Sequence, residues 1–461
     1  MAQFNINSLP KTKGVYVVGG SLRDLLLGRT PSDYDIVVCG DPQEFALQVA
    51  RSTAGRLVAL GKPGRRIWRV VTLRHIFDIS STAGRSIEED LRQRDFTVNA
   101  LAHDLYSANV IDCTGGRQDL AHKIVRMISP NIFQDDPVRL LRAYRLAATL
   151  GFTVEPQTEA AIGNEAHLIR YSAGERIREE LFKIFRTANS FDYIGRMASG
   201  GLLFAILPEL LSLQNCRQNI HHQYDVWGHT LRAYEQLEQL LKDTGRATAG
   251  LTPGVSVHMD PRRQTLLKWA LLLHDIGKPA VQTADADGGL HFYGHDRKGA
   301  EMARAICHRL RLATRDTDYT ELIVRHHSRP LFLFQAAQKR PLTPKALTKF
   351  FMQFRNYVPD LLLHAVADGQ GKGDPHDRQS QAFVAFALQT LAEFQKRFKP
   401  REALPPLLNG NDLIEEFNLV PSPLFRTLLN LVEEERLSRQ RMNRREALEL
   451  VRSFLQRTTA G

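Results

Sequence analysis

The chain has 461 residues, which is too long for one ordinary hydrophobic core and predicts roughly two to four domains. Hydrophobic residues make up 43% of it, which is enough to fold globular units. Its 61 Lys and Arg against 50 Asp and Glu give a net charge of +11. This charge favours a polyanionic partner such as RNA over an acidic or neutral one.

Cysteine usage and hydropathy narrow the class of protein further. Four cysteines are scattered without Cys-x-x-Cys spacing, which argues against a zinc finger or a disulfide framework and fits a reducing cytosol. We find no apolar leader at the N-terminus and no apolar run of 18 residues. We therefore expect a cytoplasmic protein that does not associate with membranes.

The first informative segment is a short apolar run, Val15–Val18, which predicts a buried strand because its residues are β-branched or aromatic. Gly19 and Gly20 follow and end the strand, and without side chains they let the backbone approach phosphate oxygens closely. Residues 21–28 have helical spacing, with Arg23 in the first turn. The N-terminal amides of this helix are suited to an anion.

Two aspartates stand just before the next apolar run, which predicts a second strand. Asp33 and Asp35 are two residues apart, so on a strand both carboxylates point to one face. Paired carboxylates suit Mg²⁺, which bridges triphosphate oxygens and activates an attacking hydroxyl. Either element alone is explained equally well by a surface turn. Together they predict nucleotide binding.

This order of motifs resembles the signature of the class II tRNA nucleotidyltransferase and bacterial poly(A) polymerase superfamily, which is GG, then RD, then DxD. Members of that family add nucleotides to RNA 3′ ends without a nucleic-acid template. The resemblance implies a polymerase β-like α+β head in which Asp33 and Asp35 are catalytic ligands of Mg²⁺. It also implies that Gly20 and Arg23 bind the nucleotide.

A second segment, residues 91–105, resembles the family motif RRDFTxNA, with Gln93 in place of the first arginine. The resemblance implies that Arg94 contacts the triphosphate and that Asn99 braces the sugar or the loop. The alternative is that Arg94 belongs to a surface ion pair of little energetic value. Asp78, in a strand-like stretch, is a further candidate for the carboxylate set, although a lone Asp at a strand end is more often a turn or cap residue.

After the head, strand signals nearly vanish and helical patterns take over. Asp136 followed by Pro137 predicts an N-cap carboxylate and a proline in the first helical position. Arg139, Arg142 and Arg145 follow at three-residue steps and therefore lie along one side of the predicted helix. From the pattern alone, a capped amphipathic helix with a solvated basic stripe explains this segment.

The family resemblance gives the same segment a function. It implies that Asp136 and Arg139 form an amino-acid template for the incoming base, and that Arg142 helps to hold the nucleotide. A carboxylate accepts from the exocyclic amine of C or A, while a guanidinium donates to ring acceptors. The segment from residue 172 resembles the motif that closes this neck region, and its Glu175 and Arg176 are interpreted as packing and ion-pair residues.

The second half carries a separate set of histidines and aspartates in the order H, HD, H, H, D. Neutral imidazoles with carboxylates suit a divalent metal that activates water against a phosphoester. The adjacent pair in LLLHDIGKP is the most specific element, and the set resembles an HD-domain phosphohydrolase. The resemblance implies the metal ligands His229, His274, Asp275 and Asp368. His295 and His326 are further candidates.

These motifs predict an α+β nucleotidyltransferase head followed by all-α neck, HD and tail domains. The C-terminal segment resembles the tail of bacterial members, and its basic residues 436–445 fit either RNA contacts or a solvated helix face. The predicted domains are residues 1–125 for the head, 126–222 for the neck, 223–375 for the HD domain and 376–461 for the tail.

The leading hypothesis is a tRNA nucleotidyltransferase that adds CCA, or only CC, to tRNA from CTP and ATP, with a possible HD phosphohydrolase activity. The segment between the third strand and the RDF motif, residues 80–85, is short, which favours a CC-adding enzyme or one whose switch lies elsewhere. Poly(A) polymerase is the nearest alternative. Alternatives of other classes are a stand-alone HD nucleotide hydrolase and a non-catalytic RNA-binding protein.

Overall fold

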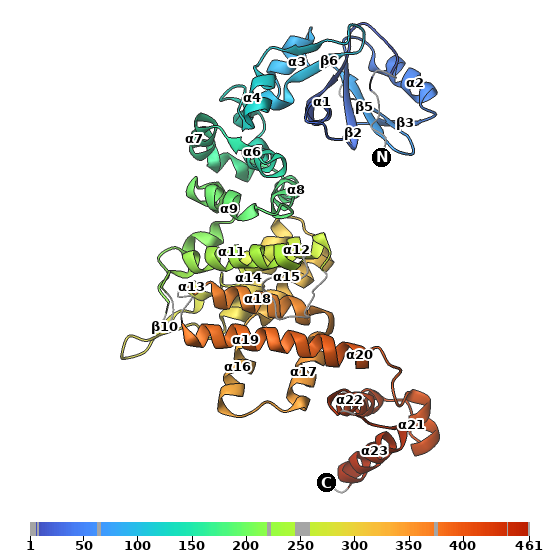
Figure 1. Ribbon diagram of the computed structural model, residues 1–461, viewed down its shortest axis with the longest axis vertical. Helices are drawn as coiled ribbons and strands as arrows, with labels where there is room; N and C mark the ends of the chain where they lie inside the picture. The colour runs from blue at the N-terminus through green and yellow to red at the C-terminus, as the bar shows by residue number, and fades with distance from the viewer. Residues whose placement is uncertain are drawn as a thin grey trace. The chain divides into compact units, whose positions relative to one another are not determined.

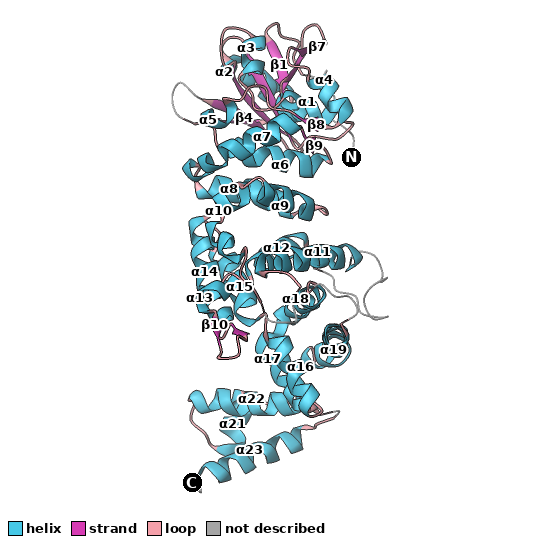
Figure 2. Cartoon of the chain, turned by 90° about the vertical axis from the view of Figure 1, so that its left-hand side faces the viewer, coloured by secondary structure: helices cyan, strands magenta, loops and turns pink. Residues whose placement is uncertain are grey.

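The computed structural model describes residues 6, 9–61, 66–218, 223–244, 259–372, 377–439 and 441–459. The chain divides into two compact units, Met1–Pro208 and Glu209–Gly461 (Figure 1). Strands gather at the N-terminal end of the first unit, whereas helices make up nearly all of the second (Figure 2). The predicted class, an α+β head followed by helical domains, is confirmed. The division into four domains at the stated boundaries stays a prediction.

The head is built on a seven-stranded sheet with the strand order β3-β4-β5-β2-β1-β6-β7 in the described part of the chain. Strands β2 and β5 pair in parallel, and the other neighbours pair antiparallel. In chain order the strands are β1 Val15–Val18, β2 Asp33–Val38, β3 Arg56–Leu60, β4 Ile67–Val71, β5 Ile76–Ser81, β6 Leu101–Asp104 and β7 Val110–Asp112. The sheet thus places β1 and β2, which carry the first motif, at its centre.

Alternating side chains give β2 two different faces. Tyr34 and Ile36 are buried, and the Tyr34 ring stacks on Phe77 of β5 with ring centroids 5.3 Å apart. Asp33 and Asp35, which alternate with them, are exposed. The period of two along a strand therefore aims both carboxylates away from the core.

Helices cover the sheet and continue into the rest of the first unit. Buried residues from β1, β2, α3 and β6 form one cluster of the head core. The helices of this unit are α1 Gly19–Leu26, α2 Pro42–Ser52, α3 Ile87–Arg92, α4 Gly116–His122, α5 Ile132–Asp135, α6 Val138–Leu150, α7 Pro156–Glu165, α8 Gly174–Phe185, α9 Ser190–Ser199 and α10 Leu202–Ile206. Two short parallel strands, β8 Ile124–Val125 and β9 Thr153–Val154, lie beside α6.

Two local predictions were wrong by a few residues. Helix α1 begins at Gly19 rather than after the two glycines, so Arg23 is its fifth residue and lies beyond the first turn. Helix α6 begins at Val138, and Asp136 makes no capping hydrogen bond. The reason is that the Asp136 carboxylate binds a guanidinium of another helix instead, as described below.

The second unit is a helical assembly in which α11 packs against α12 and α18, and α14 packs against α15 (Figure 1). Its helices are α11 Val226–Thr244, α12 Pro261–Leu273, α13 Lys278–Val281, α14 His295–Arg309, α15 Thr314–His326, α16 Arg329–Lys339, α17 Pro344–Phe354, α18 Val358–Gln370, α19 Arg378–Glu393, α20 Lys399–Glu402, α21 Gly410–Phe417, α22 Pro423–Ser438 and α23 Arg444–Thr459. A small hairpin, β10 Thr283–Ala284 and β11 Leu290–His291, separates α13 from α14.

Helix α12 is buried on nearly all sides from Thr265 to Leu273, which explains its mostly apolar sequence, and the one charged residue there, Lys268, pairs with Glu238 at 2.7 Å. It ends at the histidine and aspartate of the HD motif, so the motif lies at the centre of this unit. The last helices, α21 to α23, enclose an apolar cluster of their own. None of the described helices combines the length and apolar composition needed to cross a membrane. All four cysteines are free thiols.

Candidate active site and metal centre

The carboxylates of the head lie on neighbouring central strands. Asp35 of β2 stands directly opposite Asp78 of β5 in the parallel register. Asp78 is held by Arg69 of β4 through two hydrogen bonds of 2.7 Å from the guanidinium. The structure thus brings Asp78 beside the predicted pair but neutralises it, whereas Asp33 is bonded only to the neighbouring Ser32 hydroxyl among the described side chains.

The environment of Asp35 is rich in negative charge. Crowding by protein atoms raises the pKa of Asp35 although the residue reaches the surface, and the carboxylates of Asp78 and Asp33 raise it further. The guanidiniums of Arg94 and Arg23 act in the opposite direction. A raised carboxyl pKa with acidic neighbours is what a site for a cation requires, because the bound ion relieves the repulsion.

Gly19 brings the backbone of the first motif against the second motif. Its φ is +71°, and a Cβ there would lie 3.0 Å from Nη1 of Arg94 and 3.2 Å from Oδ2 of Asp35. Arg94 itself is held by Asp90, with two bonds of 2.9 and 3.0 Å to Oδ2. The absence of a side chain at Gly19 therefore lets Arg94 reach the edge of the carboxylate site.

A chain of polar contacts connects α1 with the neck. Arg23 donates to the Asn99 side-chain oxygen at 2.6 Å, and the Asn99 amide donates to Asp95 at 3.0 Å. The other oxygen of Asp95 accepts from Arg142 of α6 at 3.1 Å. Asn99 thus braces the loop, one of its two predicted roles, and Arg142 is tied to the structure rather than left in solvent.

The predicted basic stripe of α6 is not solvated. Arg145 donates to Glu180 of α8 at 2.7 Å, and Arg142 lies 3.6 Å from the other oxygen of the same carboxylate. Arg139 makes one long bond, 3.4 Å, to the Ile132 carbonyl oxygen. Its Nε is buried without a hydrogen-bond partner, which leaves an unused donor three residues after Asp136.

Asp136 is bound by the predicted ion-pair residue Arg176. The guanidinium donates to both carboxylate oxygens, at 2.9 and 2.8 Å. Burial raises the pKa of Asp136, but Arg176, Arg142 and Arg139 outweigh it and hold the pKa below its usual value. The carboxylate is therefore ionised and acts only as an acceptor at neutral pH.

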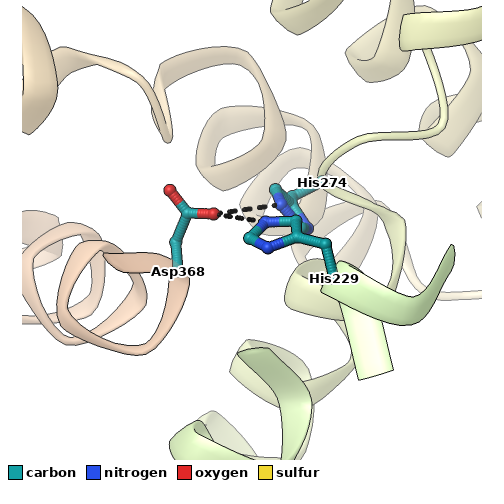
Figure 3. Close-up of side chains that lie close together, drawn as sticks. All are labelled: His229, His274 and Asp368. Atoms are coloured by element: carbon teal, nitrogen blue, oxygen red, sulfur yellow. Dashed lines mark hydrogen bonds and ion pairs between the residues drawn. The ribbon is translucent and has the colours of Figure 1, made fainter. Parts of the chain in front are cut away.

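The HD motif assembles a second site from helices far apart in sequence. His229 of α11 and His274, next to α12, both point toward Asp368 of α18 (Figure 3). Their Nε2 atoms lie 2.8 and 3.5 Å from the same oxygen of Asp368. These three residues form one group with metal-ligand spacing.

A second group with metal-ligand spacing lies beside the first. It consists of Asp275, His295 and His327. The Nε2 atoms of His295 and His327 lie 3.7 and 3.8 Å from one oxygen of Asp275, whose other oxygen is 3.1 Å from Nε2 of His274. All four predicted ligands are therefore brought together, and His295 joins them.

The choice of His326 was wrong, and His327 takes its place. The ring of His326 packs on Phe354 with ring centroids 4.9 Å apart, whereas His327 is buried in the histidine cluster. The two residues are adjacent at the end of α15, where one step of the helix turns the side chain by about 100°. In the sequence, the two adjacent histidines indicated a ligand at this place. Their spacing does not indicate which of the two side chains faces the cluster.

Hydrogen bonds at the far ring nitrogens orient the histidine ligands. The Nδ1 atoms of His274, His295 and His327 donate to main-chain carbonyl oxygens at 2.7 to 2.8 Å, and that of His229 does so at 3.2 Å. This bond leaves each Nε2 aimed at the carboxylates. Metal-ligating histidines are typically held in this way, so the donor set fits a divalent transition metal.

The charge state of the cluster agrees with a cation site. Burial lowers the pKa of His274, but Asp275 and Asp368 outweigh it and raise the pKa to about 10. Burial and the neighbouring His274 and His295 lower the pKa of His327 to about 3. The two carboxylates therefore attract a positive charge that the buried imidazoles supply only in part. A bound metal ion would supply the rest.

Access to this cluster is through a cavity of about 270 Å³ that Asp275, His295 and Asp368 line together with aromatic and basic residues. Lys278 lies on its wall and donates to Asp275 at 2.7 Å and to Gln218 at 2.7 Å. The exposed rings of Tyr293 and Phe332 stand at the cavity. A cavity of this volume has room for a small molecule but not for a folded macromolecule.

Family models match three segments of the chain. A poly A polymerase head domain matches residues 15–126, a probable RNA and SrmB-binding site of polymerase A matches residues 151–213, and an HD domain matches residues 226–349. The fold, the paired aspartates and these matches define a nucleotidyltransferase with a polymerase-type head and an HD domain. The predicted membership of this superfamily is confirmed.

Curated relatives specify the family. The chain is 34% identical to an A-adding tRNA nucleotidyltransferase of Deinococcus radiodurans, covering 97% of this chain and 96% of the relative. It is 30% identical to a CC-adding tRNA nucleotidyltransferase of Thermus thermophilus, covering 92% of this chain and 90% of that protein. The chain belongs to the tRNA nucleotidyltransferase family.

Solved structures agree on the fold. A Thermotoga maritima CCA-adding enzyme complexed with tRNA has a TM-score of 0.66 at 21% identity, covering 98% of this chain and 94% of that one. A complex of a CCA-adding enzyme with CTP gives the same TM-score and coverage. The similarity extends over both units of the chain.

Proposed function

We propose that this protein adds the C and A residues of the CCA end, or only part of them, to tRNA, with CTP and ATP as substrates. The observation that carries the proposal is the arrangement of Asp33 and Asp35 side by side on the exposed face of β2, next to Arg94 and the first turn of α1. The names of the relatives, A-adding and CC-adding, support tRNA as the acceptor.

The head residues fit Mg²⁺, because exposed carboxylates with a raised pKa at Asp35 require a cation nearby. Asp33 and Asp35 would hold the ion, and when bound it would polarise the phosphate oxygens and activate the terminal hydroxyl of the RNA. Gly20, Arg23 and Arg94 would bind the triphosphate. The site would thereby position the α-phosphorus for attack, with pyrophosphate as the leaving group.

Base selection would fall to Asp136 and Arg139. An ionised carboxylate accepts from the exocyclic amine of C or A but repels the carbonyl oxygen that U or G presents at that position. The unpartnered Nε of Arg139 is a donor for a ring acceptor. Arg142, through Asp95 and Asn99, would link this pair to the phosphate-binding Arg23.

The subtype depends on the connection between β5 and α3, which contains only residues 82–86. A short connection supports an enzyme that performs only one part of CCA addition, either the two C residues or the final A. From the sequence, the short connection favours CC addition. The relative that is 34% identical over 97% of the chain is named A-adding, so addition of A to a CC end is the second candidate.

The test uses tRNAs that end before CCA, after C and after CC, each incubated with labelled CTP or ATP and Mg²⁺. A CC-adding enzyme extends the first two with CTP only, whereas an A-adding enzyme extends only the CC end with ATP. Long A tracts on any RNA would identify a poly(A) polymerase. Binding of tRNA without extension would identify a non-catalytic RNA-binding protein and overturn the proposal.

The same assay tests the metal assignment. Asp35→Asn should abolish incorporation, because it removes a charged oxygen ligand. Glu44→Gln is a matched control, since Glu44 is an exposed acid of the same domain on α2. Equal incorporation by Asp35→Asn and the control would refute the assignment of Asp35.

We also propose a phosphohydrolase activity for the HD site, supported by the two groups of ligands and the cavity beside them. His229, His274 and Asp368 would hold one divalent ion, and Asp275, His295 and His327 would hold a second. Bound ions would activate water against a phosphoester. Lys278, which reaches Asp275 from the cavity wall, would bind a phosphate oxygen.

Metal content and hydrolysis of p-nitrophenyl phosphate and its bis ester test this second activity. We expect about two ions per chain in the wild type and about one in His327→Ala, while the neighbouring variant His326→Ala keeps both. His274→Ala should lose hydrolysis and keep nucleotide incorporation. Equal loss of incorporation in His274→Ala would contradict two separate sites. Hydrolysis without incorporation in the wild type would favour a stand-alone HD hydrolase.

We propose that the protein acts in the cytoplasm. The tRNA substrate named for the relatives supports this prediction, and so do the free cysteines. Fractionation of cells that express a tagged chain is the direct test.

A further inference from the structure

The contact between Arg176 and Asp136 joins two helices that the base-selecting pair needs in fixed positions. Arg176 is on α8 and Asp136 precedes α6, and the guanidinium bonds to both carboxylate oxygens at 2.9 and 2.8 Å. Such a two-point contact fixes the plane of the carboxylate as well as its distance. The side chain of Asp136 therefore has one orientation in the structure.

One face of α8 contacts the segment of Asp136 and α6 through two side chains, Arg176 and Glu180. Arg176 and Glu180 are four residues apart, so they lie on the same side of the helix. While Arg176 binds Asp136, Glu180 accepts from Arg145 and lies 3.6 Å from Arg142. The residues predicted to hold the nucleotide are thus oriented by charges of opposite sign on a neighbouring helix.

The pair of Arg176 and Asp136 is only partly shielded from solvent. The side chain of Arg176 is 47% exposed and that of Asp136 is 22% exposed. Partly exposed ion pairs typically contribute up to about 1 kcal/mol to the free energy of unfolding, and bidentate pairs lie at the upper end of that range. The two-point contact fixes the Asp136 carboxylate, while its partial exposure leaves it within reach of a ligand, and this combination points to a role in positioning.

We propose that Arg176 is a positioning residue for base selection, which orients the Asp136 carboxylate toward the exocyclic amine of C or A. The proposal rests on the proposed function of Asp136 as a base reader. Each carboxylate oxygen keeps a second lone pair after binding Arg176, so Asp136 retains its capacity to accept from the base. Arg176 itself touches no reacting atom in this scheme.

The charge of Arg176 has a second effect on the same group. The charged groups that act on Asp136 are Arg176 from α8 and Arg142 and Arg139 from α6, and together they lower its pKa. A protonated carboxyl would donate to the carbonyl oxygen of U or G and so accept the wrong base. Without Arg176, this loss of discrimination should begin at a higher pH.

The test compares Arg176→Gln, Arg176→Lys and the control Arg178→Gln, which removes a charge of the same helix that pairs with Glu179. The readout is the ratio of kcat/KM for the correct nucleotide over UTP, measured between pH 5.5 and pH 8 on wild type and variants. We expect Arg176→Gln to lower this ratio roughly tenfold at neutral pH and to shift its acidic limb upward. Arg176→Lys should restore part of it, because a point charge keeps the ionisation but not the two-point geometry.

Asp136→Ala separates failure of this inference from failure of the proposed function. If Asp136→Ala loses selectivity and Arg176→Gln keeps the wild-type ratio at every pH, the positioning role is wrong and the base reader stands. If Asp136→Ala keeps full selectivity, the base reader itself is wrong. A fall of kcat/KM by the same factor for all nucleotides in Arg176→Gln would indicate a purely structural contact and overturn the inference.

Discussion

Gly19 is the residue at which the first motif and the RDF segment meet. Its φ of +71° favours glycine, and a Cβ there would press on the Arg94 guanidinium and the Asp35 carboxylate. Two separate costs are therefore combined at one position: backbone strain and displacement of two functional side chains. A second glycine of the same helix region, Gly28, has φ of +70° and open space around its Cβ position.

This difference makes a matched pair of variants. We expect Gly28→Ala to lower the free energy of unfolding by about 1 to 2 kcal/mol through its left-handed backbone, and Gly19→Ala to lower it by at least as much. Only Gly19→Ala should also lower nucleotide incorporation, by about tenfold or more, because it moves Arg94 and Asp35. Steady-state kinetics and thermal unfolding measure the two effects. Equal activity in the two variants would contradict the close approach seen at Gly19.

Asp95 is a buried carboxylate whose charge is needed by its partners. Burial raises its pKa, but Arg142 and the bonds from Asn99 and the Phe96 backbone together lower it below the usual value. Because the folded-state pKa is lowered, the carboxylate stabilises the fold above the unfolded-state pKa of about 3.9. That stabilisation is lost as the pH falls through the folded-state pKa.

We expect Asp95→Asn to lower the midpoint of thermal unfolding at pH 7 by an amount that corresponds to about 3 kcal/mol, because Arg142 loses its buried partner. The gap between variant and wild type should narrow as the pH falls below about 4, because the unfolded wild-type chain then binds a proton at this carboxyl that the folded chain still excludes. Asp41→Asn is the control. Asp41 is the N-cap of α2, and Asn accepts the same capping hydrogen bond about as well as Asp. A gap that stays constant down to pH 3 would show that charge is not the cause.

At the scale of elements, the second unit has a close backbone approach between Gly277, just before α13, and the first turns of α14. A Cβ on Gly277 would lie 2.2 Å from the His295 carbonyl oxygen and 2.5 Å from the Gly299 nitrogen. Both atoms belong to the backbone, so neither can move without shifting a helix. The HDIGK segment therefore requires glycine for packing, and this contact fixes His295 relative to His274 and Asp275.

We predict that Gly277→Ala lowers the free energy of unfolding of the HD unit by about 3 kcal/mol or more, because overpacking against rigid backbone exceeds the usual cost of 1 to 3 kcal/mol. Metal binding by the second unit should fall with it, while nucleotide incorporation is kept. Gly195→Ala in α9 is the control, since nothing lies near its Cβ position and helix propensity favours Ala. Normal metal content in a folded Gly277→Ala would refute the packing argument.

The basic residues 436–445 of the tail can be interpreted from the acidic side chains that they bind. Arg436 is buried and bound to Glu433, Arg439 is bound to Glu435, and Arg444 is bound to Asp412. These arginines were open to two interpretations, RNA contact or a helix face. Their ion pairs within the tail favour a structural role for this run.

At the scale of the whole molecule, the net charge of +11 is the feature that acts on a polyanion. Each phosphate that the protein neutralises releases counterions, so affinity falls as salt rises. We expect the Kd for tRNA to rise about 100-fold between 50 and 200 mM salt, which corresponds to about four phosphate contacts. The KM for CTP, a small ligand held at one site, should change much less. A salt-independent Kd for tRNA would argue against electrostatic binding.

The two compact units also predict separable chemistry. The carboxylate pair of the head lies in Met1–Pro208 and the histidine cluster in Glu209–Gly461, so variants in one unit should leave the other activity intact. The paired assays of incorporation and hydrolysis described above measure this directly.

Local patterns in the sequence determined much of this protein. The strand at Val15–Val18 follows from its β-branched and aromatic residues, and the common face of Asp33 and Asp35 and the helical second half follow from spacing that repeats every two or 3.6 residues. The adjacent residues of the HD motif were found through the resemblance to HD-domain phosphohydrolases, and as neighbours in sequence they remain neighbours in space. These predictions needed no knowledge of how the elements pack.

Only the tertiary structure decided which side chains meet across elements. Arg176 binds Asp136 from 40 positions away, and Arg69 neutralises Asp78 from the neighbouring strand. His327 rather than His326 joins the histidine and aspartate cluster because of the rotation of α15 against its neighbours. Such pairings depend on the relative rotation and register of packed elements, which hydrophobic burial sets globally. No local spacing encodes them.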